Sequence, residues 1–151
     1  MPITILITTE NENCIPHYAS KGAAGADVKA NIKENITIRP GEFKLIPTGC
    51  KVEIPEGFEI QVRPRSGLSL KTGLIIKNAP GTVDQDYTGE CSVIMHLLQG
   101  PTLGTGEYYN IRRGDRIAQA VLCPVVIPDL EEVTELDETE RGSNGFGSSG
   151  V

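Results

Sequence analysis

The chain has 151 residues, a length that fits one domain with its own hydrophobic core and argues against two. Its 14 Lys and Arg against 20 Asp and Glu give a formal net charge of -6 at pH 7. This balance argues against a protein that coats nucleic acid or an anionic membrane surface, so any phosphate that it binds must be met by locally placed groups.

The N-terminal segment MPITILITTENEN has no basic region, and its apolar run is too short for a signal peptide or a membrane span. The part ITILIT instead alternates like a strand. The four cysteines, at positions 14, 50, 91 and 123, show no C-x-x-C spacing, which favours free and mostly buried thiols. We therefore expect a soluble cytoplasmic protein.

Short β-branched runs separated by turn residues recur along the chain. We expect strands over residues 3–8, 35–38, 43–49, 58–63, 74–77, 91–98, 108–111 and 117–127, and one helical turn around 69–72. Seventeen glycines and ten prolines are scattered through the sequence, so no run of about twelve residues keeps an unbroken helical period. The residues therefore predict an all-β fold: a sandwich, a jelly roll or a small barrel.

The hydrophobic pattern also indicates what each segment faces. FEIQVR (58–63) alternates strictly between apolar and polar side chains, as in a half-buried antiparallel strand. Segments 91–98 and 117–127 are apolar on both faces, so we expect them between sheets or against another subunit. Residues 137–151 show no pattern. We therefore divide the chain into a catalytic body, 1–136, and a mobile C-terminal arm, 137–151.

Arginine is unevenly distributed. Six of the seven arginines and none of the seven lysines fall in RPRSG (63–67), IRRGDRIAQ (111–119) and RGSNGFG (141–147). Arginine forks match phosphate oxygens in pairs, and the serine and glycine of PRSG add a donor and a close backbone approach. PRSG also fits an ordinary turn with a surface ion pair, and taken alone the motif favours that interpretation.

A Pro- and Gly-rich stretch, NAPGTVDQDYTGE (78–90), places Asp84, Asp86 and Tyr87 on a short rigid span. A carboxylate held there can act as a general base on water, although an acidic hairpin loop with a packed tyrosine fits the pattern equally. GAAGADVKA adds Asp27 after two glycines, where it could reach a divalent ion or be a simple turn aspartate.

Five segments, taken together and in order, resemble the five motifs of the homotrimeric dUTP diphosphatase (dUTPase) family. They are AGADVKA, RPRSGLSLKTGL, NAPGTVDQDYTGE, RRGDRIAQAV and RGSNGFGSSG, and they run from about residue 22 to the C-terminus. The resemblance implies a distorted β jelly roll and Mg²⁺-dependent hydrolysis of dUTP to dUMP and pyrophosphate, which removes dUTP and supplies dUMP for thymidylate synthesis. It also implies a homotrimer whose three sites combine motifs of neighbouring chains.

The third motif implies the catalytic and uridine-binding residues. Asp84 stands at the position of the general base that orients and activates the attacking water. Tyr87 stands where a tyrosine ring packs under the deoxyribose and leaves no room for a 2′-hydroxyl. The uracil edge is read by a closed hairpin that excludes a 5-methyl group and includes Asn78, Gly81, Thr82 and Val83.

The first, second and fourth motifs imply the phosphate and metal sites. The phosphate-binding residues are Arg65, Ser66, Gly67 and Gln119, the last near the water shell of the metal. Asp27 is expected to hold Mg²⁺ through water, because this ion keeps several of its waters. Arg116 is expected to hold the frame of the site by pairing with Asp86 or another carboxylate.

The fifth motif implies that the arm folds over bound nucleotide. Phe146 is expected to stack on the uracil face, while Arg141, Ser148 and Ser149 hold the terminal phosphates and Gly147 lets the arm lie close. Ordering the arm costs conformational entropy that only the full substrate offsets, so the closed site is expected to form around the right nucleotide.

Three other classes of protein stay open. A relative of the dCTP deaminases would share the jelly roll and part of the hairpin, but the tyrosine of DQDY and the full arm favour the diphosphatase. A non-catalytic nucleotide-binding relative is expected to lack Asp84 or the arm. A structural jelly roll, such as a coat or sugar-binding module, predicts no dependence on nucleotide. No nucleic acid or membrane partner is expected.

Overall fold

The computed structural model describes residues 3–98 and 108–145. Its elements are β1 (Leu6–Thr9), the 3-10 helix η1 (Glu12–Cys14), β2 (Ala26–Lys29), β3 (Ile36–Ile38), β4 (Phe43–Glu53), β5 (Phe58–Arg63), α1 (Ser66–Thr72), β6 (Leu74–Ile76), β7 (Gly81–Val83), β8 (Cys91–Leu97), β9 (Tyr109–Ile111) and β10 (Arg116–Pro124). Strands dominate these ranges, which confirms the predicted all-β fold.

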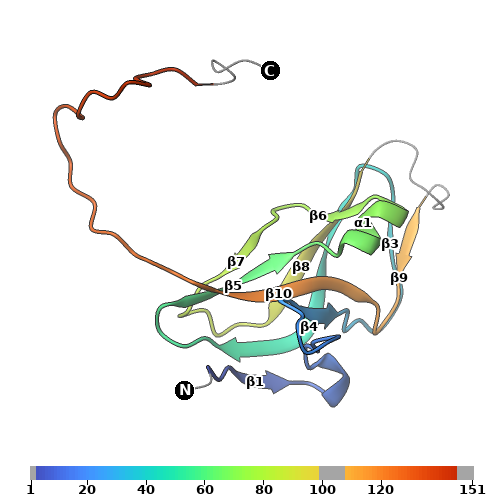
Figure 1. The fold of residues 1–151 in the computed structure, drawn as a ribbon. Helices are drawn as coiled ribbons and strands as arrows, with labels where there is room; N and C mark the ends of the chain where they lie inside the picture. The colour runs from blue at the N-terminus through green and yellow to red at the C-terminus, as the bar shows by residue number, and fades with distance from the viewer. Residues whose placement is uncertain (1–2, 99–107, 146–151) are drawn as a thin grey trace.

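Two four-stranded sheets form the body (Figure 1). Their strand orders are β1-β4-β8-β6 and β2-β10-β5-β7, and β3 pairs with β9 in a separate two-stranded sheet. All the pairings are antiparallel. Strands that are far apart in the sequence are neighbours in each sheet, as β2 and β10 are. The resulting fold is the predicted jelly roll.

The hydrophobic core lies between the two sheets. Ile46 of β4 and Met95 of β8 pack in one buried cluster with Val28 of β2 and Ile117 of β10. Burying an aliphatic side chain of this size contributes about 2 kcal/mol, so the cluster supplies much of the free energy that holds the sheets together. A smaller cluster around Ile60 covers the other end of the sandwich.

Several elements differ from the predicted boundaries: β1 and β10 are shifted or shortened, and β7 was not an expected strand. The segment around Asp27, which the residues alone left as a turn, is the buried strand β2. Helix α1 begins at Ser66 rather than around 69. It ends at Thr72 and is capped by Gly73, which has a φ of 74° and donates its N–H to the carbonyl of Ser69 at 2.9 Å. β4 continues to Glu53, four residues beyond the expected end.

The C-terminal segment leaves the body early. β10 ends at Pro124, and residues 126–144 are exposed and run away from the sandwich without regular structure (Figure 1). The four cysteines are free as predicted, two of them buried and two half-buried. Within the described ranges, α1 has seven residues and no helix has the length and apolarity to cross a membrane.

Candidate active site

A pocket of about 350 Å³ opens where β5 leads into α1 and passes beside β10. It is lined by Arg65, Ser66, Gly67, Leu68, Lys71, Arg116 and Gln119. The four residues predicted to bind phosphate therefore lie together, although they come from segments about fifty residues apart. Pro64 precedes the extended residue Arg65, and α1 begins directly after it. The pocket can thus offer hydroxyl, backbone and cationic donors to an anion.

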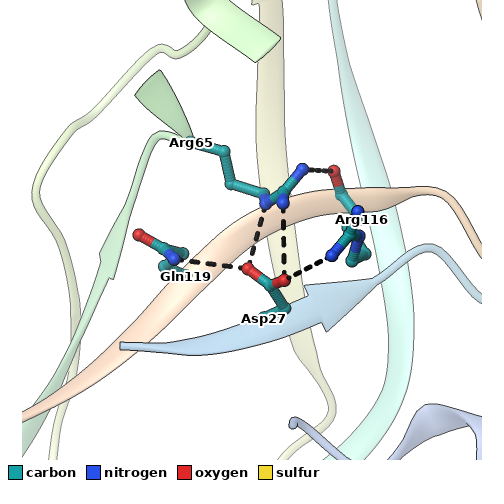
Figure 2. A network of polar contacts seen from close by, with 4 residues as sticks. All are labelled: Asp27, Arg65, Arg116 and Gln119. Carbon is teal, nitrogen blue, oxygen red and sulfur yellow. Dashed lines mark hydrogen bonds and ion pairs between the residues drawn. The ribbon is translucent and has the colours of Figure 1, made fainter. Parts of the chain in front are cut away.

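Asp27 lies at the centre of a network of ionic and polar contacts beside this pocket (Figure 2). Its Oδ1 accepts hydrogen bonds from Nε of Arg65 at 3.0 Å and from Nε2 of Gln119 at 3.3 Å. Its Oδ2 accepts from Nη2 of Arg65 at 3.4 Å and from Nη1 of Arg116 at 3.1 Å. β2 and β10 hold this arrangement because Asp27 and Gln119 are cross-strand partners.

The environment of Asp27 fixes its charge. Burial raises the pKa of this carboxyl, because its side chain is only 4% exposed, but the hydrogen bonds and charges of Arg65, Gln119 and Arg116 outweigh burial. The pKa therefore lies below the ordinary 3.8. Asp27 is ionised at neutral pH and offsets the charge of two arginines.

The same contacts limit what else Asp27 can bind. An ionised carboxylate has about four acceptor sites, and four N–H donors occupy them here. Contact with a water of a bound metal therefore requires one donor to leave. Among the described residues, no group of three or more His, Cys, Asp or Glu side chains could hold a metal ion. The pocket fits an ion that arrives already bound to phosphate oxygens.

Asp84 and Tyr87 lie on a tight turn at the end of β7. The backbone N–H of Tyr87 donates to the carbonyl of Asp84 at 3.1 Å, and the carboxylate of Asp84 is exposed. The Tyr87 hydroxyl donates to the carbonyl of Glu90 at 2.9 Å. A Cβ at Gly89 would lie 2.6 Å from Cζ of Tyr87, so the ring rests against the glycine. An exposed carboxylate beside a fixed aromatic ring can act on water next to a bound sugar.

The residues predicted to read uracil lie on the strand before this turn. β7 contains Gly81, Thr82 and Val83 and pairs with β5. The amide of Asn78 lies against Gly81, where a Cβ would be 3.2 Å from its Nδ2. In the described ranges, β7 pairs only with β5, whereas β8 pairs with β4 and β6. The strands before and after the Asp84 turn, β7 and β8, therefore belong to different sheets. Residues 78–90 include a crossing between the two sheets and do not form a hairpin of paired strands.

Only the first part of the predicted arm motif falls within the described residues. Arg141 Nε donates to the carbonyl of Asn144 at 2.8 Å, and Gly142 has a φ of 53°. These contacts form a local turn that leaves the guanidinium exposed. The other expected arm residues, Phe146, Gly147, Ser148 and Ser149, lie outside the described residues.

The dUTPase family model matches residues 11–150 of the chain. The chain belongs to the dUTPase family. The deoxyuridine 5′-triphosphate nucleotidohydrolase of Fusobacterium nucleatum is 52% identical over 136 residues, which cover 90% of this chain and 89% of that relative. This agreement across the motifs confirms the resemblance inferred from the sequence.

Solved dUTPase structures share the fold. A variant dUTPase of Staphylococcus bacteriophage 80alpha with dUpNHpp has a TM-score of 0.84 at 30% identity, covering 98% of this chain and 99% of that one. A variant dUTPase from phage phi11 of S. aureus, described with a structural Mg(II) ion, has a TM-score of 0.76 at 28% identity, covering 89% and 99%.

Arg116 pairs with a carboxylate as expected, and the partner is Asp27 rather than Asp86, because β2 lies directly beside β10. One feature of the dUTPase site was not predicted from the sequence. Lys71 joins the pocket because it lies three residues after Leu68 and four after Gly67, on the same face of α1. The motif quoted for the phosphate turn contains Lys71, but only the position of α1 shows that its side chain lines the same pocket.

The dUTPase site residues form two groups on one chain. The first surrounds Asp27 and the pocket at α1, and the second follows β7 with Asp84 and Tyr87. Within residues 3–98 and 108–145, no hydrogen bond or ion pair joins the two groups. One chain therefore presents the residues predicted to bind phosphate and the predicted base, Asp84, in two separate groups.

Proposed function

We propose that this protein hydrolyses dUTP to dUMP and pyrophosphate. One observation carries the proposal: an exposed carboxylate, Asp84, is joined by a single backbone turn to Tyr87, in a chain that belongs to the dUTPase family. Asp84 takes the proton of the attacking water, and Tyr87 packs under the deoxyribose. The reaction removes dUTP and supplies dUMP.

The pocket at α1 binds the phosphate chain in this proposal. Ser66 and Gly67 supply donors at the start of the helix, while Lys71 and Arg116 supply positive charge. Arg65 donates to Asp27 through two of its nitrogens and to the carbonyl of Arg116 through Nη1, so it holds the frame as well as facing the pocket. These donors stabilise the negative charge that develops as pyrophosphate leaves.

Magnesium is the cofactor that we propose. When bound to the phosphates, Mg²⁺ neutralises their charge and fixes their geometry. In this proposal Gln119 and, after release of one donor, Asp27 would contact its waters, and the hydrogen bond between their side chains supports the pairing of these two roles. The remaining roles belong to the protein, because its cations orient the phosphates and its carboxylate at position 84 accepts the proton.

We further propose that the active unit is a homotrimer with sites between chains. Val126, Ile127 and Leu130 are about nine-tenths exposed (89%, 89% and 93%), an arrangement that favours contact with another subunit. The separation of the two groups of site residues on one chain supports the same arrangement, because a neighbouring chain could supply the missing half. The arm would then close over the nucleotide. Free thiols fit the reducing cytoplasm.

The test is pyrophosphate release by purified protein with Mg²⁺ from dUTP, dTTP, dCTP and UTP at equal concentration, with Asp84→Asn protein as the control. Release from dUTP alone supports the proposal and its selection of both base and sugar. Ammonia from dCTP without pyrophosphate would assign the protein to the deaminases instead. Binding of dUTP without turnover would leave a nucleotide-binding protein, and no nucleotide dependence would leave a structural jelly roll.

A further inference from the structure

β4 contains an irregularity where it passes the end of the Asp84 turn. Pro47 pairs with Ser92 of β8, but Cys50 pairs with Cys91, so two residues of β4 have no partner on β8. These residues are Thr48 and Gly49. An irregularity of this kind takes backbone N–H and C=O groups out of the ladder, and these groups need other partners.

Glu90 supplies one of these partners. Its Oε1 accepts a hydrogen bond from the backbone N–H of Gly49 at 2.7 Å, in a half-buried position. The Thr48 hydroxyl donates to the carbonyl of Cys91 at 2.6 Å, directly beside it. A carboxylate acceptor strengthens such a bond roughly twofold over a neutral one. Two adjacent residues at the end of the turn are therefore pinned to β4.

The glycine at the other end of this contact is closely surrounded and bonded on both sides. Gly49 has a φ of 70°, and a Cβ there would lie 2.6 Å from Nδ2 of Asn31 and 2.8 Å from Sγ of Cys14. Its carbonyl accepts from the N–H of Glu10 at 3.1 Å. Gly49 is thus a rigid anchor, and the position of Glu90 follows from it.

Tyr87 in turn depends on Glu90. The tyrosine hydroxyl donates to the carbonyl of Glu90 at 2.9 Å, and the ring rests against Gly89. Tyr87 is 45% exposed as a residue, so nearly half of its surface has no protein contact. Of the two residues that locate the ring, Glu90 is tied to β4 through Gly49, and Gly89 directly precedes it.

We propose that Glu90 is a positioning residue that sets the choice between deoxyribose and ribose. Its carboxylate anchors the end of the turn on Gly49, and this anchor keeps the Tyr87 ring where it excludes a 2′-hydroxyl. The inference rests on the proposed function, and it adds a residue that acts on sugar selection through Tyr87. Without the carboxylate, the ring shifts and the penalty against UTP falls.

A purely structural role for Glu90 predicts a different effect on the dUTP-to-UTP ratio. If Glu90 only stabilises the fold, its loss lowers the melting temperature and slows dUTP and UTP turnover by the same factor. A positioning role changes the ratio of the two kcat/KM values, because displacement of a positioning group by about 1 Å can change a rate by up to a hundredfold. The ratio therefore separates the two roles.

The experiment compares kcat/KM for dUTP and UTP, with Mg²⁺, in full-length wild type, Glu90→Ala and Glu90→Gln. We expect the dUTP preference to fall about tenfold in Glu90→Ala and to return to within about threefold of wild type in Glu90→Gln, which keeps an acceptor oxygen. Glu56→Ala, at an exposed turn glutamate, is the matched control and should leave the ratio unchanged.

Each outcome decides one question. An unchanged ratio in a folded Glu90→Ala protein overturns the inference, whatever happens to its melting temperature. If Glu90→Ala does not fold, Glu90→Asp replaces it: the carboxylate is one methylene too short to reach Gly49, and an unchanged ratio again overturns the inference. Wild type that releases no pyrophosphate from dUTP refutes the proposed function, and the inference with it. If the wild type prefers dUTP, the proposed function stands, and the ratio in the variants then tests the role of Glu90 alone.

Discussion

The carbonyl of Asp84 accepts a hydrogen bond from the N–H of Tyr87 at 3.1 Å, so the proposed base and the proposed sugar platform are the two ends of one backbone turn. Any shift of the turn moves both groups together. Because the last strand before it, β7, is fixed to β5, and Glu90 is fixed to β4, the turn is held from both sheets. Proton transfer and sugar selection therefore share one structural support.

Asp84→Asn should abolish turnover and spare binding. The amide keeps the size of the side chain and the backbone turn, but it cannot accept the proton of the attacking water. We expect kcat for dUTP to fall about 10³-fold, within the range that a general base contributes. Calorimetric titration with Mg²⁺ and dUTP should give a Kd within a few-fold of wild type. Substantial pyrophosphate release by this variant would remove Asp84 from the role of base.

Gly89→Ala should relax sugar selection. An added Cβ would lie 2.5 Å from the hydroxyl oxygen and 2.6 Å from Cζ of Tyr87, so the half-exposed ring must move. We expect the kcat/KM ratio of dUTP to UTP to fall about tenfold with little loss of thermal stability, because the ring can shift toward solvent. Gly22→Ala, where an added Cβ meets nothing within 4 Å, is the control. An unaltered ratio in Gly89→Ala would mean that ribose is rejected elsewhere.

Asp27→Asn should lower stability in a way that depends on pH. The pKa of Asp27 is depressed in the folded protein, so its contribution to the free energy of unfolding is present above the ordinary value of 3.8 and is lost as pH falls through the folded pKa. We expect a loss of about 2 kcal/mol at pH 7, below the usual figure for a fully buried pair because Arg116 is half exposed.

Urea unfolding of both proteins at one protein concentration, from pH 7 down to the acid limit of folding, measures this effect. The difference between wild type and Asp27→Asn should shrink below pH 3.8 as the wild-type carboxylate gains its proton. Asp137→Asn, at an exposed arm aspartate, should show no such trend. A difference that stays constant with pH would show that the ion pairs contribute little.

Periodicity predicted most of the strands because their side chains alternate against a core. FEIQVR is β5 with its expected bounds, and CSVIMHL is β8. The buried strand β2 escaped prediction because it is four residues long, follows a glycine and carries a charged residue, Asp27. Nothing local marks a carboxylate as buried. Its partners come from residues 65, 116 and 119, which the pairing of β10 with both β2 and β5 brings together.

The candidate site was also predicted in part. Motif order predicted which residues share the phosphate pocket, since the resemblance carries the long-range pairing that periodicity lacks. It did not predict the crossing of residues 78–90 between the sheets, because strand runs on both sides of a turn look alike whether or not they pair. It also missed Glu90, whose role depends on an irregularity in β4 that leaves no trace in the hydrophobic pattern.

Lys71→Ala should weaken substrate binding more than it slows chemistry. Lys71 lines the pocket with Arg65 and Arg116, and in the described part of the chain it makes no ion pair, unlike both arginines. We expect KM for dUTP to rise about tenfold at low salt, with a smaller effect at high salt, because exposed charges are screened. Lys33→Ala, in the exposed loop after β2, is the matched control. Equal KM values in the two variants would exclude Lys71 from phosphate binding.

Two truncations should separate assembly from closure of the arm. A chain ending at Glu140 keeps the exposed apolar segment that contains Val126, Ile127 and Leu130, whereas a chain ending at Val125 loses it. If that segment contacts a neighbouring subunit, light scattering should find a trimer for the longer chain and a smaller species for the shorter one. The longer chain should still lose about a hundredfold in turnover if the arm closes over the nucleotide as we propose, because it lacks the proposed closing residues.

The full-length variant Ile127→Asp separates two explanations for dissociation of the shorter truncation: loss of apolar contacts and loss of chain length. A charge at this position, 89% exposed in a single chain, costs nothing in a monomer but is expensive once it is buried against a partner. We therefore expect Ile127→Asp to dissociate like the shorter truncation, while Glu131→Ala in the same exposed segment stays assembled. A trimer that survives both Ile127→Asp and truncation at Val125 would place the subunit contacts on the sandwich itself, and normal turnover by the chain ending at Glu140 would end the closing role of the arm.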